Sequence, residues 1–132
     1  MPDGRFTVLV VDDSAVFRQR IIRLLNDQNI HPLLQARNYE EAISCIQNTT
    51  VNLVLLDISM PGKSGIQLLK LIKNRYAAIK VWIISNHADE HYKEVCMLAG
   101  ANYFFDKSLD FEEIEHRLRT IKNEIQTTEI AK

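Results

Sequence analysis

The segment VNLVLLDISMPGKSG, residues 51–65, decides how this chain folds. Its first part, 51–56, is a nearly unbroken apolar run rich in branched side chains. The run is too short for an ordinary helix and predicts a strand buried on both faces. Asp57 ends the run, and the Met-Pro-Gly sequence at 60–62 cannot extend a strand, so a loop must follow. Because open parallel sheets place their chemistry beyond the carboxyl ends of the strands, Asp57 is a candidate functional residue.

Four further apolar runs predict the other strands, at 6–11, 31–36, 79–84 and 102–106. Segments with helical apolar spacing follow all five strands, and their helices are expected to begin near Ser14 (or Asp13), Asn38, Ser64, Asp89 and Asp110. This alternation is typical of a parallel sheet with helices on both faces. Right-handed crossovers and a switch point after the first strand predict an α/β fold, a doubly wound five-stranded parallel sheet of order 2-1-3-4-5, flavodoxin-like.

Two details of this arrangement follow from single residue types. Pro32 has no N–H group for a strand ladder, so the strand at 31–36 is expected at an edge of the sheet. The apolar positions of the first helix are expected to face the core. Its three arginines, Arg18, Arg20 and Arg23, are expected to face solvent.

The 132 residues contain no repeat and no Pro/Gly-rich linker, so we predict one domain over 1–132, with a core of about 5–125 and a frayed tail over 127–132. Sixteen basic and seventeen acidic residues give a net charge of -1, which does not favour direct binding to nucleic acid. Cys45 and Cys96 lack a CxxC spacing and are expected to be reduced core thiols. Without a signal peptide or an apolar run of roughly 18 residues, a cytoplasmic protein with no membrane contact is expected.

Acidic residues follow two strands that should be neighbours. Asp12 and Asp13 come directly after the strand at 6–11, and Asp57 ends the strand at 51–56. Two carboxylates about 4 Å apart repel each other by roughly 4 kcal/mol at an effective dielectric constant near 20. A hard divalent cation with oxygen ligands relieves this repulsion, and Mg²⁺ fits because it accepts carboxylates together with phosphate oxygens.

Two further strands end on side chains that suit phosphoryl chemistry. Lys107 follows the strand at 102–106 and offers a positive charge to Asp57 or to a phosphoryl oxygen, and Ser85 offers a hydroxyl donor. A carboxylate beside a metal and an ammonium group suits attack on a phosphoryl group. The product would be an aspartyl phosphate on Asp57.

These residues together resemble a known family. The acidic pair, the DISMPG sequence at 57–62, Ser85 and Lys107 are similar to the CheY-like receiver domain of two-component response regulators. The resemblance extends over about residues 5–125. It implies a phosphorelay signalling protein rather than an enzyme. The chemistry of such a protein is limited to Mg²⁺-dependent self-phosphorylation and autodephosphorylation.

The resemblance also implies roles for the residues of the site. Asp57 would accept a phosphoryl group from a phosphohistidine of a sensor histidine kinase or a phosphotransfer protein. Asp12 and Asp13 would hold Mg²⁺, helped by Asp57 and the backbone carbonyl of Ser59. Lys107 would contact the phosphoryl group.

A switch to a second surface is implied as well. Ser85 would reorient toward the phosphoryl group, and Phe104, three positions before the lysine, occupies the aromatic switch position. A surface formed by the segments 89–99, 102–106 and 110–125 would then bind a downstream protein. Its candidate contact residues are Met97, Tyr103 and Arg119, and the chain would act as a monomer or a phosphorylation-linked dimer.

Some positions depart from the usual family pattern. Ser108 follows the lysine where proline is usual, and Asn86 follows the switch hydroxyl where a small residue is usual. Phe104 has no hydroxyl for a tyrosine-type hydrogen bond. Ser59, Asn86 and His87 are expected to tune access to the phosphoryl group and its loss.

Three other functions compete with this interpretation. A phosphohydrolase with an aspartate nucleophile typically needs a second acid two residues later, where this chain has Ser59. A flavin binder would need a phosphate-binding loop after the first strand, where the acidic pair would repel phosphate. The main alternative is a receiver-like adaptor that binds proteins without being phosphorylated.

Overall fold

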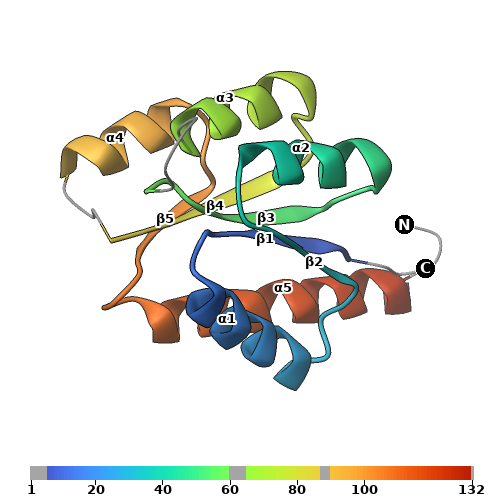
Figure 1. Ribbon diagram of the computed structural model, residues 1–132. Coiled ribbons are helices and arrows are strands. Elements are labelled where there is room, and N and C mark those ends of the chain that lie inside the picture. The colour runs from blue at the N-terminus through green and yellow to red at the C-terminus, as the bar shows by residue number, and fades with distance from the viewer. Residues whose placement is uncertain (1–5, 60–64, 87–89, 132) are drawn as a thin grey trace.

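The computed structural model describes residues 6–59, 65–86 and 90–131 (Figure 1). Its five strands form one parallel sheet of order β2-β1-β3-β4-β5, which confirms the predicted fold and the edge position of β2. The strands are β1 (Val8–Val11), β2 (Leu33–Ala36), β3 (Leu53–Asp57), β4 (Lys80–Ser85) and β5 (Tyr103–Asp106). The helices are α1 (Ala15–Asp27), α2 (Tyr39–Asn48), α3 (Gly65–Arg75), α4 (Glu90–Leu98) and α5 (Phe111–Ala131). The predicted helix starts Ser64 and Asp89, the loop 60–62 and His87 lie outside the described residues.

The helices cover both faces of the sheet, with α2, α3 and α4 on one side and α1 and α5 on the other (Figure 1). Alternate residues of the central strands serve the two layers. Leu9 and Leu56 belong to one buried cluster, and Val10 and Leu55 belong to the other. Burial on both faces is why β1 and β3 read as continuous apolar runs rather than as alternating ones.

The first two helix starts follow from capping side chains. Ser14, rather than Asp13, caps α1, because its hydroxyl oxygen accepts a hydrogen bond from the N–H of Phe17 at 3.2 Å. Asn38 caps α2 by accepting from the N–H of Glu41 at 2.8 Å. These caps fix where the chain turns away from the sheet after β1 and β2.

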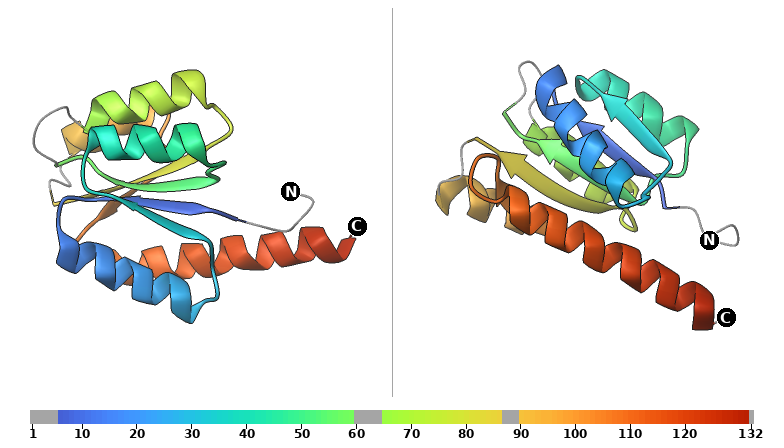
Figure 2. Two further views of the ribbon diagram at one scale, coloured as in Figure 1. Left: turned by 45° about the vertical axis from the view of Figure 1, so that its right-hand side comes forward. Right: turned by 90° about the horizontal axis from the view of Figure 1, so that it is seen from below.

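Helix α5 continues to Ala131, so the prediction of a frayed segment from Thr127 is wrong over 127–131. No glycine or proline interrupts the sequence between Phe111 and Ala131, so nothing in it ends the helix earlier. Figure 2 shows α5 running along the sheet and projecting beyond it. Within the described ranges, no helix has the length and apolar character needed to cross a membrane.

Gly65 opens α3 immediately against the end of β3. A Cβ atom at this position would lie 2.5 Å from the Cα of Ile58 and 2.9 Å from the backbone oxygen of Asp57. Both neighbours are main-chain atoms, which cannot rotate away as a flexible side chain could. The absence of a side chain at Gly65 therefore lets α3 begin close to Asp57.

We predict that Gly65→Ala lowers the free energy of unfolding by about 1 to 3 kcal/mol, because the added methyl group overpacks a contact between backbones. Urea unfolding followed by circular dichroism measures the change. Lys70→Ala, on an exposed position of the same helix, is the control and should stay within about 0.5 kcal/mol of wild type. Equal stability of Gly65→Ala and wild type would contradict the close approach of α3 to β3.

Candidate functional site

The polar residues predicted from the sequence lie together at the carboxyl edge of the sheet. Asp12 directly follows β1, Asp57 is the last residue of β3, Ser85 ends β4, and Lys107 directly follows β5. Because all five strands are parallel, their carboxyl ends meet at one edge. The fold therefore brings residues from four separate parts of the chain into one site.

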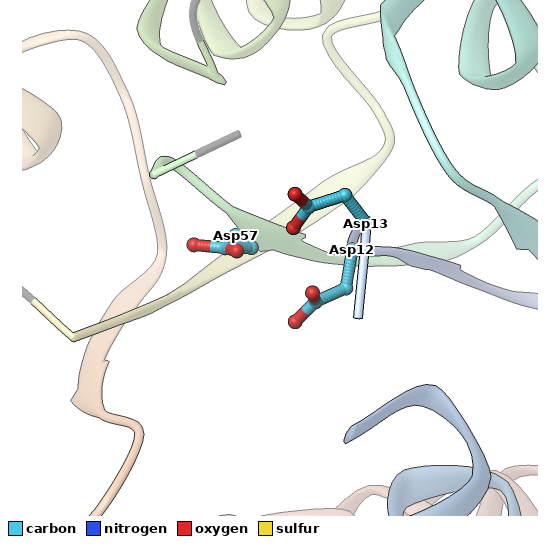
Figure 3. A group of neighbouring side chains, drawn as sticks. All are labelled: Asp12, Asp13 and Asp57. Carbon is cyan, nitrogen blue, oxygen red and sulfur yellow. The ribbon is translucent and has the colours of Figure 1, made fainter. Parts of the chain in front are cut away.

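Three carboxyl groups form the centre of this site. Asp12, Asp13 and Asp57 each offer an oxygen, and these oxygens all lie within 4.8 Å of one another. Figure 3 shows the three side chains at the neighbouring ends of β1 and β3. Asp12 and Asp57 are only 2% and 3% exposed, whereas Asp13 is exposed. An all-carboxylate set of this size fits a hard divalent cation, so the site is a candidate divalent metal site.

Lys107 supplies the positive charge that the three acids need. Its Nζ lies 2.8 Å from Oδ2 of Asp12 and 3.5 Å from Oδ2 of Asp57. The pairing with Asp57 predicted from the sequence is confirmed, and the structure adds Asp12 as a second and nearer partner. The ammonium group lies between two buried carboxylates of like charge and stabilises both.

The other oxygen of each buried carboxylate accepts a backbone hydrogen bond. Oδ1 of Asp12 accepts from the N–H of Ser14, and Oδ1 of Asp57 accepts from the N–H of Ser59, both at 2.8 Å. These bonds orient the carboxyl groups so that each Oδ2 faces Lys107. Both carboxylates are therefore held in place by the loops that follow their strands.

Burial dominates the acidity of Asp12. Loss of solvent raises the pKa of the Asp12 carboxyl, and the charge of Asp57 raises it further. The hydrogen bonds from Lys107 and from the backbone of Ser14 act in the opposite direction but do not cancel the effect of burial on this pKa. Keeping the buried Asp12 carboxylate ionised therefore lowers the stability of the fold, and a bound cation would reduce this effect.

Ser85 joins the site to the next strand. Its side chain is fully buried, and its Oγ lies 3.5 Å from Oγ of Ser59, where either hydroxyl could donate. Its backbone oxygen accepts from the N–H of Lys107 at 2.9 Å. Phe104 lies in β5 opposite Ile83 of β4 and is partly buried against the core under α2, α3 and α4.

A cavity of about 400 Å³ opens beside Asp57. It is lined by Asp13, Ser14, Val16, Phe17, Arg20, Asp57, Ser59, Asn86 and Lys107. Two residues predicted to tune access, Ser59 and Asn86, therefore do border the approach to Asp57. His87, the third, lies outside the described residues.

The predicted output residues lie apart from this cavity. Met97 on α4 and Tyr103 on β5 are 43% and 37% exposed, and the side chain of Arg119 on α5 is 59% exposed. The Arg117 guanidinium stacks on the Tyr103 ring at 4.6 Å and links β5 to α5. The structure thus places the three residues on exposed positions of α4, β5 and α5.

Two residues of α1 take part in the site in ways that the sequence did not predict. Arg18 was expected to face solvent, and this was wrong: it is buried, and its Nη1 donates to the backbone oxygen of Asp12 at 2.6 Å. Its Nε donates to Oε1 of Gln35 on β2 at 3.1 Å. Phe17 was expected only in the core, but its ring centroid lies 4.4 Å from Nζ of Lys107. Helical spacing gives the face of a residue but not its partner across the sheet, so no signal in the sequence predicted these contacts.

The family model of the response regulator receiver domain matches residues 8–119. The chain therefore belongs to this family and is a receiver domain of two-component systems. The Fimbriae Z protein of Salmonella typhimurium is 31% identical over 116 residues, covering 87% of this chain and 55% of that protein. The response regulator UvrY of Escherichia coli (strain K12) is 30% identical over 115 residues, covering 86% and 53%. The chain spans about half the length of these curated relatives.

Solved structures show the same fold. The CheX-CheY-BeF3-Mg+2 complex from Borrelia burgdorferi matches with a TM-score of 0.81 and 28% identity, covering 91% of this chain and 96% of that chain. A CheY-like receiver domain protein from Methanospirillum hungatei JF-1 matches with a TM-score of 0.80 and 22% identity, covering 97% and 99%. The CheY-like architecture predicted from the sequence is confirmed.

We predict that Asp12→Asn raises the free energy of unfolding in metal-free buffer at about pH 7. Burial raises the pKa of Asp12 above its ordinary value of 3.8 in the folded chain. Between that value and the raised pKa, the folded chain binds more protons than the unfolded chain, so wild-type stability falls as the pH rises through this window. Asp12→Asn has no carboxyl group to titrate at this position. The difference in the free energy of unfolding between the variant and wild type should therefore be small at about pH 4 and should grow toward neutral pH. Urea unfolding in EDTA at a series of pH values measures the difference, and a variant less stable than wild type at neutral pH would contradict the prediction.

Proposed function

We propose that this receiver domain accepts a phosphoryl group on Asp57 from a phosphohistidine of a sensor histidine kinase or a phosphotransfer protein. One observation carries the proposal: Asp57 lies with two further carboxylates within 4.8 Å, faces the ammonium of Lys107 and borders a cavity. A buried carboxylate beside a cation and a site for a divalent metal suits attack on phosphorus.

The transfer breaks one bond and forms one. A carboxylate oxygen of Asp57 attacks the phosphorus atom, and the P–N bond to the donor histidine breaks. The donor ring carries a proton on its other nitrogen, so it leaves as neutral imidazole. The N–H of Ser59 already holds Oδ1 of Asp57 at 2.8 Å, which leaves Oδ2, on the side of Lys107, for the attack. Lys107 then stabilises the negative charge on the phosphoryl oxygens.

Mg²⁺ is the proposed cofactor. Asp12, Asp13 and Asp57 would hold it with the backbone carbonyl of Ser59, and when bound it supplies positive charge to the phosphoryl oxygens during transfer. The raised pKa of Asp12 supports this assignment, since a buried carboxylate with an unfavourable charge gains most from a cation. The Borrelia complex, 28% identical to this chain, was crystallised with BeF3 and Mg+2, which supports magnesium as the metal.

Lys107 would change partner during the reaction. In the structure it pairs mainly with Asp12, at 2.8 Å. With Asp12, Asp13 and Asp57 holding a divalent cation, the charge of Asp12 would no longer depend on Lys107, and the flexible side chain of Lys107 would be free to follow Asp57 and its phosphoryl group. The longer distance of 3.5 Å to Asp57 is in this account a resting distance that shortens on phosphorylation.

Phosphorylation would act by shifting an existing equilibrium. Ser85 would turn toward the phosphoryl group, leaving Ser59, and Phe104 would move into the vacated space. To change the ratio of active to inactive conformation from 1:99 to 99:1, phosphorylation must stabilise the active conformation by about 5.5 kcal/mol relative to the inactive one. A few charge-assisted contacts supply this amount. The exposed surface with Met97, Tyr103 and Arg119 would then bind a downstream protein.

In this function the chain would be a cytoplasmic signalling module rather than an enzyme. It would act as a monomer or a phosphorylation-linked dimer, without direct contact to nucleic acid. Ser59, Asn86 and His87 would set the lifetime of the aspartyl phosphate. The alternative is an adaptor that is never phosphorylated. The pairing of Lys107 with Asp12 and the unusual Asn86 and Ser108 favour the adaptor, whereas the complete set of acids, hydroxyl and ammonium favours the receiver.

We predict that incubation with acetyl phosphate and Mg²⁺ adds about 80 Da, the mass of one phosphoryl group, as measured by intact mass spectrometry. Asp57→Ala should gain no mass, and excess EDTA should abolish the adduct in wild type. Asp27→Ala, which removes an exposed acid at the end of α1, is the matched control and should be phosphorylated normally. A folded wild-type chain that gains no mass would favour the adaptor.

A further inference from the structure

An aromatic ring faces the ammonium group of the site lysine. Phe17, in the first turn of α1, places its ring centroid 4.4 Å from Nζ of Lys107. Its side chain is 8% exposed and also lines the cavity beside Asp57. The contact is made to the charged end of the lysine rather than only to its apolar stem. The negative electrostatic potential of an aromatic face attracts a cation at this distance.

Lys107 is therefore held by three groups. Its Nζ contacts Asp12 at 2.8 Å, Asp57 at 3.5 Å and the Phe17 ring at 4.4 Å, and its side chain is only 11% exposed. The two acids attract the ammonium, and the ring adds a third contact, which carries no charge. For water to take the place of this ring, the buried Phe17 side chain would have to leave the core. Among the many rotamers of this four-carbon side chain, such a contact favours those that keep the ammonium beside the two carboxylates.

The backbone around Lys107 has its own supports. Its N–H donates to the backbone oxygen of Ser85 at 2.9 Å. The Asp106 carboxylate accepts from the N–H groups of Ser108 and Leu109 at 2.8 and 3.0 Å, which shapes the turn that follows Lys107. These bonds fix the backbone position of Lys107 but not the position of its ammonium group.

The ring itself is fixed relative to this turn. One helical turn after Phe17, the guanidinium of Arg20 lies 4.0 Å from the ring centroid of Phe111, the first residue of α5. Two cation–aromatic contacts thus join α1 to the segment that carries Lys107. In one contact α1 supplies the ring, and in the other it supplies the cation. This arrangement holds the Phe17 ring at a set distance from the lysine.

We infer that Phe17 is a positioning residue for phosphoryl transfer, because its ring holds the Lys107 ammonium toward the carboxylates of Asp12 and Asp57. The inference rests on the proposed function of the site. Leucine at position 17 keeps an apolar side chain in the core but offers no ring face to the ammonium. Tyrosine keeps the face.

The test compares three variants in the initial rate of phosphorylation by acetyl phosphate at saturating Mg²⁺, followed by intact mass. Phe17→Leu should be slower than wild type by roughly five- to tenfold, the loss expected for a partly desolvated cation–aromatic contact. Phe17→Tyr should restore the rate to within about twofold of wild type. Leu24→Ala removes a buried side chain from the same helix and the same core cluster without touching the lysine. It should lower stability but leave the rate unchanged.

A spectroscopic measurement tests the contact independently of phosphorylation. In ¹³C-labelled protein, the protons on the ε-carbon of Lys107 should be shifted upfield by the ring current in wild type and Phe17→Tyr, and this shift should be lost in Phe17→Leu. Equal rates for wild type and Phe17→Leu, or an equal slowing in Leu24→Ala, would overturn the role of Phe17. A wild-type chain with the ring-current shift that gains no phosphoryl adduct would instead contradict the proposed function, and with it any part for Phe17 in the transfer.

Discussion

The structure of this site depends on one constraint, the placement of two buried carboxylates of like charge around a single ammonium group. Asp12 directly follows β1 and Asp57 ends β3, and the two strands are paired from Val8 with Leu53 to Val11 with Leu56, which keeps the two carboxylates close together. Burial disfavours the charge of Asp12, and Lys107 offsets part of this effect. The single ammonium group leaves part of the negative charge of the three acids unbalanced, and a divalent cation can neutralise it.

The remaining architecture serves to keep these groups in place. Two separate cores bury both faces of the central strands, so β1 and β3 cannot shift against each other without exposing apolar side chains. The cap at Ser14 and the guanidinium of Arg18 hold the residues that directly follow β1, and the close start of α3 at Gly65 packs against the end of β3. Functional groups on loops gain a defined geometry only when the scaffold beneath them is rigid.

Comparison of sequence and structure shows what local patterns determine. The strands, their order and the meeting of the three acids followed from apolar runs and from the parallel topology, and the structure confirms them. The choice of Asp12 as the nearer partner of Lys107, the burial of Arg18 and the ring of Phe17 beneath the ammonium were not predicted. These contacts join elements far apart in the chain and depend on how α1 packs against the sheet, which helical periodicity does not specify.

The central claim is that residues from four strand ends act together on one oxygen of Asp57. Backbone amide NMR spectra recorded with Mg²⁺ and beryllofluoride, a mimic of the phosphoryl group, test this claim most directly. The account predicts a saturable change at the amides of Asp13, Ser59, Ser85 and Lys107 that extends to Phe104 and to the exposed surface of α4, β5 and α5, and that is absent in Asp57→Ala. Spectra that do not change, or that change equally in Asp57→Ala, would contradict it.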